Sequence, residues 1–239
     1  MVYITGDTHG DFSRFKAKQL SANNLNLTKE DSVIICGDFG GIWFPQGSEL
    51  RASDEGKLDW LAAQPWTTYF IDGNHENFEE LSKYPIEERA DGGKVQHIRR
   101  NKVIHLMRGQ VYIIENNVIF TMGGAMSHDK ALRAEGFDWW KQEEPKCSEF
   151  SEALDNIAKA NYKVDYVITH CSSTSDAKKI LNNLWREEED RSINKFFEFL
   201  QKEIYFKQWY FGHYHYDKNL NNRHTCLYKN IIPIGTRMK

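Results

Sequence analysis

The sequence of 239 residues predicts an α/β fold in which a second β-sheet packs on the first. In the first half, strand-like runs alternate with helical stretches, which is the pattern of parallel strands covered by helices. In the middle, short strand-like runs are separated by turn residues, which indicates antiparallel pairing. The length suffices for one domain with a full core, and we expect residues 1–239 to form that single domain.

Composition and charge argue against several classes of protein. The formal net charge of -3 gives no strong nucleic-acid footprint. No run approaches the roughly 18 apolar residues that a membrane-spanning helix needs, and no signal-peptide pattern precedes the first strand. The 4 cysteines lack C-x-x-C spacing, so we expect reduced thiols and neither a zinc ribbon nor a disulfide framework. These features predict a cytoplasmic protein without membrane partners, and they indicate no oligomeric state.

The first half of the chain is predicted to alternate strands and helices. Strand-like runs cover residues 2–5, 32–36 and 68–71, and helical stretches cover residues 12–20, 49–63 and 78–84. Pro85 ends the third helical stretch because proline cannot continue a helix. Residues 90–94 are predicted to form a turn that contains Gly92 and Gly93.

The second half begins with a predicted antiparallel meander. Its strands would cover residues 103–107, 110–115 and 118–122, and we expect them to start the second sheet. Further strands are predicted over residues 166–169, 208–211, 225–228 and 231–234. Helices are predicted over residues 148–162 and from the charged run 186–191 to about residue 204, with that run as a solvated helix face.

Five of the strand-like runs end in Asp, Asn or His. The first ends in Gly6-Asp7-Thr8-His9, which delivers a carboxylate and an imidazole to one side of the backbone, where both can reach one cation. The other four run into Gly37-Asp38, Gly73-Asn74-His75-Glu76, His170, and Gly212-His213-Tyr214-His215. Ligands gathered from the carboxyl ends of several strands predict a site at one edge of an α/β sheet.

In their order along the chain, these motifs resemble the signature of the calcineurin-like metallophosphoesterases. That signature reads Asp-x-His, Gly-Asp, Gly-Asn-His-Asp/Glu, an isolated His, and Gly-His-x-His, and it is complete here from residue 6 to residue 215. The resemblance implies a two-sheet β-sandwich flanked by helices. It also implies hydrolysis of phosphate mono- or diesters by a metal-bridging hydroxide.

The resemblance also implies a ligand for each position of a centre with two metal ions. Asp38 would bridge the ions. Asp7, His9 and His215 would complete one ion, and Asn74, His170 and His213 the other. Imidazole, carboxylate and amide donors suit Mn²⁺, Fe, Zn²⁺ or Ni²⁺ better than Ca²⁺. We therefore expect two divalent or trivalent ions, with manganese as the first expectation.

For catalysis, the resemblance implies that His75 is the general acid and that Asp38 acts through the bridged ions. We expect a carboxylate such as Asp11 or Asp72 to orient His75. Small phosphorylated or nucleotide-like molecules are the expected substrates. His128 follows a glycine-rich strand exit and is a candidate for the pocket wall, whereas we expect His97, His105 and His224 to be surface or internally hydrogen-bonded residues.

One departure from the family bears on the substrate. Serine/threonine phosphatases of this superfamily continue the second motif to an arginine that grips the phosphate, but Gly37-Asp38-Phe39-Gly40-Gly41 has none. Candidates for a substitute are Arg99, Arg100, Arg108 and Arg133, each interpreted first as a surface residue. Aromatic side chains beside the motifs could stack a nucleobase, although loop packing is the first interpretation; these are Trp43, Phe44, Trp139 and Trp140. A serine/threonine protein phosphatase and a noncatalytic scaffold are the alternative functions, and the complete ligand set disfavours the scaffold.

Overall fold

A computed structural model describes residues 1–187 and 190–238, and these residues form two β-sheets. The first sheet has the strand order β13-β1-β2-β3-β6-β5-β4, with β13 (Ile231–Pro233), β1 (Val2–Thr5), β2 (Ser32–Ile35), β3 (Thr67–Phe70), β6 (Val103–Leu106), β5 (Lys94–Arg99) and β4 (Ile86–Glu88). The second has the order β11-β12-β10-β9-β8-β7, with β11 (Lys218–Asn219), β12 (His224–Cys226), β10 (Gln208–Phe211), β9 (Tyr166–Thr169), β8 (Asn117–Met122) and β7 (Gln110–Ile114).

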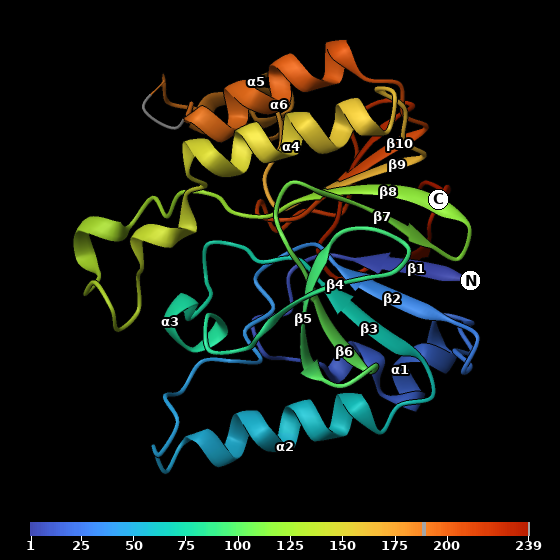
Figure 1. The fold of residues 1–239 in the computed structure, drawn as a ribbon, viewed down its shortest axis with the longest axis vertical. Helices are drawn as coiled ribbons and strands as arrows, with labels where there is room; N and C mark the ends of the chain where they lie inside the picture. The colour runs from blue at the N-terminus through green and yellow to red at the C-terminus, as the bar shows by residue number, and fades with distance from the viewer. Residues whose placement is uncertain (188–189, 239) are drawn as a thin grey trace.

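Helices cover the outer faces of both sheets, so the molecule has the predicted helix-flanked sandwich (Figure 1). On the side of the first sheet lie α1 (Ala17–Ala22) and α2 (Arg51–Ala62). On the side of the second lie α4 (Cys147–Lys159), α5 (Thr174–Leu181) and α6 (Ser192–Glu203). The short α3 (Phe78–Leu81) follows β3, and single 3-10 turns cover Ser13–Phe15, Lys130–Leu132, Lys141–Glu143 and Asn182–Leu184.

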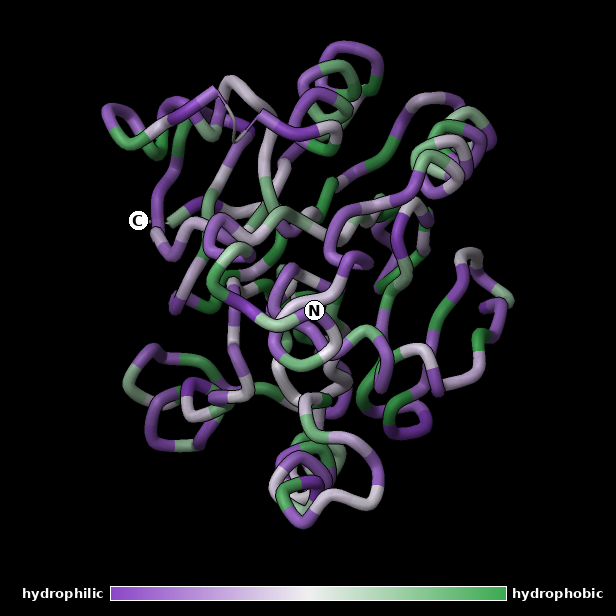
Figure 2. Tube along the Cα trace, turned by 90° about the vertical axis from the view of Figure 1, so that its left-hand side faces the viewer, coloured by the Kyte–Doolittle hydropathy of each residue, from purple (hydrophilic) through white to green (hydrophobic). Residues whose placement is uncertain are grey.

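The core consists of three apolar clusters, one between the sheets and one under each helical layer. Strand β2 shows how one run supplies two of them. Ile34 belongs to the cluster between the sheets, whereas Val33 and Ile35 pack toward α2, because successive side chains of a strand point to opposite faces. The helices carry both apolar and polar residues, as the hydropathy colours in Figure 2 show. None of the described helices combines the length and the apolar composition needed to cross a membrane.

The predicted meander is wrong at its first strand. Residues 103–106 form β6, which pairs with β3 and β5 in the first sheet, and only the hairpin of β7 and β8 belongs to the second. The turn at Arg108-Gly109 therefore carries the chain from one sheet to the other. Alternating apolar residues predict a strand but do not select its sheet. The strands β4 and β5 also formed without being predicted, on either side of the turn at Gly92 and Gly93.

Three predicted helices have clearly different bounds in the structure, and one of them, predicted over residues 78–84, is the shorter α3, which ends before Pro85 is reached. The stretch 12–20 is divided into a 3-10 turn and α1, since Lys16 is extended at φ -67° and ψ 143°. Helix α6 begins at Ser192, so the described residues of the charged run 186–191 precede the helix and do not form its solvated face. Residues 188 and 189 of that run lie outside the described residues.

We predict that Leu58→Ala lowers the free energy of unfolding by about 2–5 kcal/mol, because it opens a cavity under α2. Leu58 is fully buried in the cluster between α2 and the first sheet. Ser53→Ala on the exposed side of the same helix is the control and should change stability by less than about 0.5 kcal/mol. Equilibrium denaturation in urea measures both, and equal values would contradict the packing of α2 described above.

Candidate metal centre

The carboxyl ends of five strands, β1, β2, β3, β9 and β10, converge at one edge of the sandwich. Within each sheet these strands are parallel neighbours. Short backbone bonds hold the loops that follow them together. The N–H groups of Thr8 and His9 donate to the carbonyl oxygen of Asp38 at 3.1 and 2.7 Å, and Gly212 N–H donates to the His170 carbonyl at 2.9 Å. The predicted site residues therefore come from both sheets.

The first group of donors consists of Asp7, His9, Asp38 and His215. One ligand atom from each lies within 4.8 Å of the others, so the group could hold a metal ion. The Nε2 atoms of His9 and His215 are 3.0 Å apart. Asp7 Oδ2 lies 3.2 Å from His215 Nε2, and Asp38 Oδ2 lies 3.7 Å from His9 Nε2.

A second group of donors adjoins the first through Asp38. The Nε2 atom of His170 lies 3.3 Å from Asp38 Oδ1 and 3.0 Å from Asn74 Oδ1. His213 Nδ1 lies 3.0 Å from the same Asn74 oxygen. All seven predicted ligands are thus brought together, and Asp38 turns one carboxylate oxygen toward each group.

The electrostatics of the centre favour positive charge. Burial alone would lower the pKa of His170, but the neighbouring Asp38 charge raises it to about 10. The Asp7 hydrogen bond likewise raises the pKa of His215, whereas burial lowers the pKa of His9 and His213. Asp38 and Asp7 thus favour the protonated forms of His170 and His215. An imidazole must be neutral to bind a metal, so a bound cation would displace these protons. The residues therefore fit divalent metal ions.

The backbone at the centre is strained. Four of the seven donors have left-handed backbone conformations, namely His9 (φ 47°), Asp38 (φ 47°), His213 (φ 69°) and His215 (φ 54°). Such conformations cost of the order of 1–3 kcal/mol each for residues other than glycine and concentrate at functional sites. The neighbouring glycines make room for the ligands. A Cβ atom on Gly73 would lie 2.0 Å from Asp38 Oδ1, and one on Gly37 would lie 2.2 Å from His170 Nδ1.

The amide of Asn74 is oriented by Ser127 and Glu143. Asn74 Nδ2 donates to Ser127 Oγ at 3.1 Å, and that hydroxyl donates to Glu143 Oε2 at 2.6 Å. Because the amide nitrogen is engaged, the Asn74 oxygen faces His170 and His213. The sequence patterns did not predict this series of hydrogen bonds from Asn74 to Glu143. Ser127 lies in a glycine-rich strand exit that could have suggested it, but no local signal marks Glu143.

Arg14, which is half-buried, and Glu76, which is buried, also support the loops. Arg14 Nη2 donates to the Asp7 carbonyl at 2.6 Å, and Nη1 donates to the Gly6 carbonyl at 3.2 Å. Glu76 accepts from the Phe39 N–H at 2.6 Å, and burial together with the Asp38 charge raises its pKa to about 8. Sequence reasoning missed Arg14, which lies on the 3-10 turn directly after the first motif.

His75 lies beside the first donor group, with its ring centroid 5.5 Å from that of His9. Its backbone N–H donates to Asp38 Oδ1 at 2.7 Å. Its Nδ1 atom lies 3.2 Å from Arg133 Nη1. A guanidinium can only donate, so Nδ1 is the acceptor in this contact and Nε2 is the ring nitrogen left to carry an N–H.

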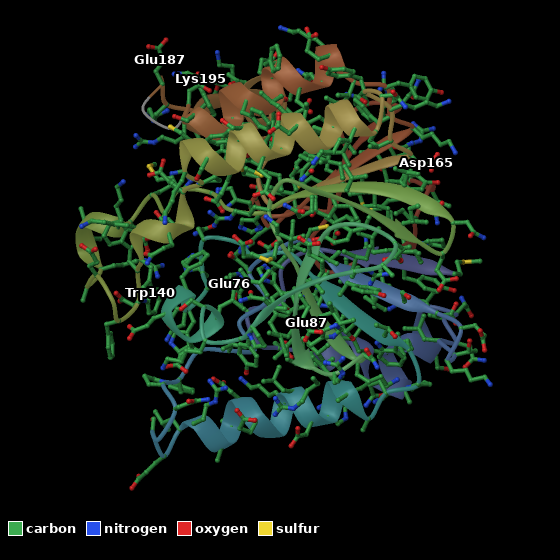
Figure 3. All side chains as sticks on the ribbon, viewed as in Figure 1. Glu76, Glu87, Trp140, Asp165, Glu187 and Lys195 are labelled. Carbon is green, nitrogen blue, oxygen red and sulfur yellow. The ribbon has the colours of Figure 1, made fainter. Side chains whose placement is uncertain are left out.

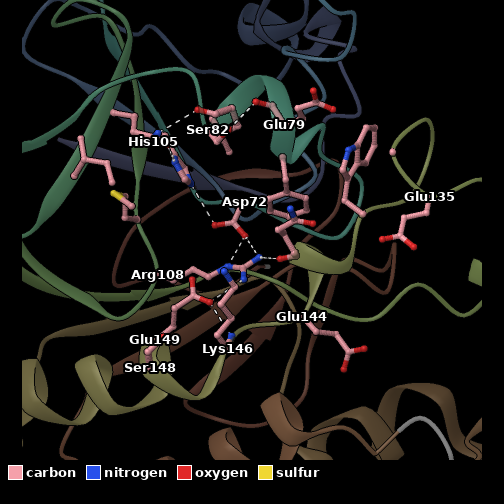
Figure 4. A pocket seen from close by; sticks show the side chains of 18 residues that line it. Asp72, Glu79, Ser82, His105, Arg108, Glu135, Glu144, Lys146, Ser148 and Glu149 are labelled. Atoms are coloured by element: carbon pink, nitrogen blue, oxygen red, sulfur yellow. Dashed lines mark hydrogen bonds and ion pairs between the residues drawn. The ribbon is translucent and has the colours of Figure 1, made fainter.

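The prediction that Asp11 or Asp72 orients His75 is wrong. Asp11 accepts from the N–H of Ser13 at 2.9 Å. Asp72 instead holds a buried ion pair, with Arg108 Nε donating to its Oδ2 at 2.7 Å and His105 Nε2 lying 3.2 Å from its Oδ1 (Figure 4). These bonds and the Arg108 charge outweigh burial and keep the pKa of Asp72 well below its usual value. Asp72 borders a cleft of about 740 Å³ that also contacts Trp140.

The remaining candidates divide between packing and the site. Arg99 pairs with Glu55 and Asp59, and Arg100 pairs with Glu87, so both are surface residues as interpreted from the sequence. Arg108 is buried, which contradicts its interpretation as a surface residue.

The other histidines and aromatic residues are placed as follows. His105 and His224 are buried and hydrogen-bonded, to Gln96 and Asp176 among others. Trp43 packs edge-on against Trp140 at 5.6 Å, which is loop packing. His128 stacks on His213 at 5.8 Å and therefore lies beside the centre, as its prediction as a wall residue requires.

Two helix-flanked sheets with carboxylate and imidazole side chains at a shared edge define an α/β sandwich with a group of residues that could hold a metal ion. The family model for calcineurin-like phosphoesterases matches residues 1–217, so the chain belongs to that family. Members of the family are generally metal-dependent phosphoesterases. A search of curated proteins gives no match.

We predict that Gly73→Ala reduces metal retention at least about tenfold, because the new methyl group would displace the Asp38 carboxylate. The metal content after loading with Mn²⁺ and dialysis is measured by mass spectrometry. Gly56→Ala on α2 is the matched control. Its Cβ meets nothing within 4 Å, so metal content should be unchanged and stability should rise by about 0.5–1 kcal/mol. Full metal content in Gly73→Ala would contradict the prediction.

Proposed function

We propose that the protein hydrolyses phosphate mono- or diesters of small or nucleotide-like molecules at a centre of two metal ions. The observation that carries this proposal is the position of Asp38, whose two carboxylate oxygens face different donor groups. Bound cations would neutralise the phosphate and lower the pKa of a water molecule that attacks phosphorus. Membership of a family of generally metal-dependent phosphoesterases supports the proposal.

In this proposal each of the two groups of donors described above holds one metal ion. Asp7, His9 and His215 would hold one ion, and Asn74, His170 and His213 the other, with Asp38 shared. Oxygen and imidazole donors without a thiolate support manganese as the first choice, with iron, zinc and nickel as alternatives. We also propose a cytoplasmic location, because all four cysteines are free thiols, which the cytosol keeps reduced.

His75 is the proposed general acid. Because Nδ1 faces the guanidinium of Arg133, Nε2 is the ring nitrogen that can present an N–H to a substrate. The bond from its backbone N–H to Asp38 holds the residue beside the centre. We propose that Nε2–H donates to the oxygen of the leaving group, a role that typically contributes a factor of about 10²–10⁴ in rate.

A serine/threonine protein phosphatase is the second candidate. The observation in its favour is Arg133, an arginine that reaches the site from outside the second motif. Rates on phosphopeptides, mononucleotides, cyclic nucleotides and oligonucleotides separate the candidates. A phosphopeptide preference would favour the second candidate, and a nucleotide preference the first.

We predict that the protein hydrolyses p-nitrophenyl phosphate or bis(p-nitrophenyl) phosphate when Mn²⁺ is supplied, and that chelation abolishes turnover. Asp38→Asn should lower kcat/KM roughly 100-fold or more, since it removes the charge shared by both donor groups while keeping the size of the side chain. Initial rates of nitrophenolate release measure both effects. Wild-type turnover no higher than that of Asp38→Asn would leave the noncatalytic scaffold as the better interpretation.

We predict that His75→Ala keeps its metal content, because the contact with Asp38 comes from the backbone. Activity on an alkyl phosphate, which has a poor leaving group, should fall by about 10²–10⁴, whereas activity on an aryl ester should fall less. The difference arises because an activated leaving group needs little proton donation. Equal losses on both esters would exclude a general-acid role.

A further inference from the structure

A segment between β8 and α4, residues 127–146, projects from the body of the molecule beside the candidate centre (Figure 1). Figure 3 labels Trp140 on this projecting segment. Its Leu132 and Phe137 are largely exposed, at 90% and 77%. Between them in sequence lies Arg133, whose side chain is only 20% exposed because it turns back toward His75.

The guanidinium of Arg133 is fixed before any substrate binds. Its Nε and Nη2 atoms donate to the two oxygens of Asp129 at 2.7 and 2.8 Å, and Nη1 donates to the Asp138 carbonyl at 3.0 Å. Asp138 in turn accepts from the Ala134 N–H at 2.6 Å, which closes the turn around the arginine. A planar group held in this way loses little freedom when it binds an anion.

The Nη1 edge of Arg133 lies next to the reacting region without belonging to it. Its contact with His75 Nδ1, at 3.2 Å, is longer than its bonds to Asp129. Among the described residues, the bonds of Arg133 are with Asp129, Asp138 and His75, and none is with the seven donors. Arg133 therefore adjoins the residue that faces the leaving group, and it does not adjoin the metal ligands.

We propose that Arg133 binds a phosphate carried by the leaving group, so the preferred substrates are phosphoric anhydrides such as nucleoside di- and triphosphates. This inference rests on the proposed function, because it is His75 that places the leaving oxygen. Asp129 takes the Nε–Nη2 edge of the guanidinium, so a phosphate oxygen would bind at the Nη1–Nη2 end, through the Nη2 N–H that the contacts above leave. Arg133 thus offers a cationic partner to a second phosphate, which a simple ester lacks.

The reaction balances as a hydrolysis. The oxygen of water forms a bond to the terminal phosphorus, and the bridging P–O bond breaks. The electron pair of that bond stays with the bridging oxygen, which leaves on the second phosphate and takes a proton from His75 Nε2. One proton of the attacking water stays on the new phosphate and the other is released to solvent, from which His75 regains the proton that it gave.

The test is equilibrium binding of two inorganic anions to the Mn²⁺-loaded protein, measured by calorimetry. Imidodiphosphate mimics both the reacting phosphate and the phosphate of the leaving group, whereas inorganic phosphate mimics only the reacting one. Arg133→Met should weaken the binding of imidodiphosphate about tenfold or more, and the binding of phosphate less than about threefold. Arg133→Lys should recover part of the loss, since it restores the charge but not the planar group that Asp129 holds in place. Arg100→Met, at a 73% exposed arginine on the surface, is the matched control and should bind both anions as the wild type does.

The outcomes distinguish this inference from the proposed function. Equal losses for both anions, or no loss for imidodiphosphate, overturn the role of Arg133 even when the wild type hydrolyses an aryl phosphate. Wild-type protein that binds neither anion and hydrolyses no ester overturns both proposals. An unfolding temperature of Arg133→Met equal to that of the wild type would show that the variant is folded. A kcat/KM for ADP that falls at least about tenfold more than the kcat/KM for p-nitrophenyl phosphate supports the inference independently of binding.

Discussion

The arrangement of the site depends on one buried carboxylate, that of Asp38. The residue is 1% exposed, and a charge in such a position is costly unless it is paired. Each of its oxygens faces imidazole nitrogens of a different donor group, and one also accepts the N–H of His75. The carbonyl oxygen of the same residue holds the loop that carries His9. Asp38 therefore fixes the backbone of two loops as well as the charge between them.

The strained loops are tolerated because the strands behind them are fully buried. The strands β2, β9 and β10 deliver Asp38, His170 and His213, and they lie among the apolar clusters on both faces. Small residues complete the arrangement, since the space that Asp38 and His170 occupy is the space that side chains on Gly73 and Gly37 would fill. Rigid strands and empty glycine positions together let four donors keep unfavourable backbone angles.

The sequence predicted the parts of the molecule that depend on local pattern. Strands that end in Asp7, Asp38, Asn74, His170 and His213 were recognisable because short apolar runs stopped at polar residues. Sheet membership was less predictable, since β6 has the same apolar pattern whether it pairs with β3 or with β7. The partners of His75 were not predictable at all. Arg133 reaches it from 58 positions along the chain, and the neighbouring Asp72 is occupied by Arg108.

Two of the candidate donors, His9 and His215, are separated by 206 positions along the chain and come from different sheets. An ion bound by both histidines would link the N-terminal and C-terminal halves of the sandwich, and a chelator would remove that link. Because such an ion binds only when both halves are in place, its affinity adds directly to the cohesion of the whole fold. Depletion of the ion would then weaken the contact between the two sheets, which the apolar cluster between them would still hold.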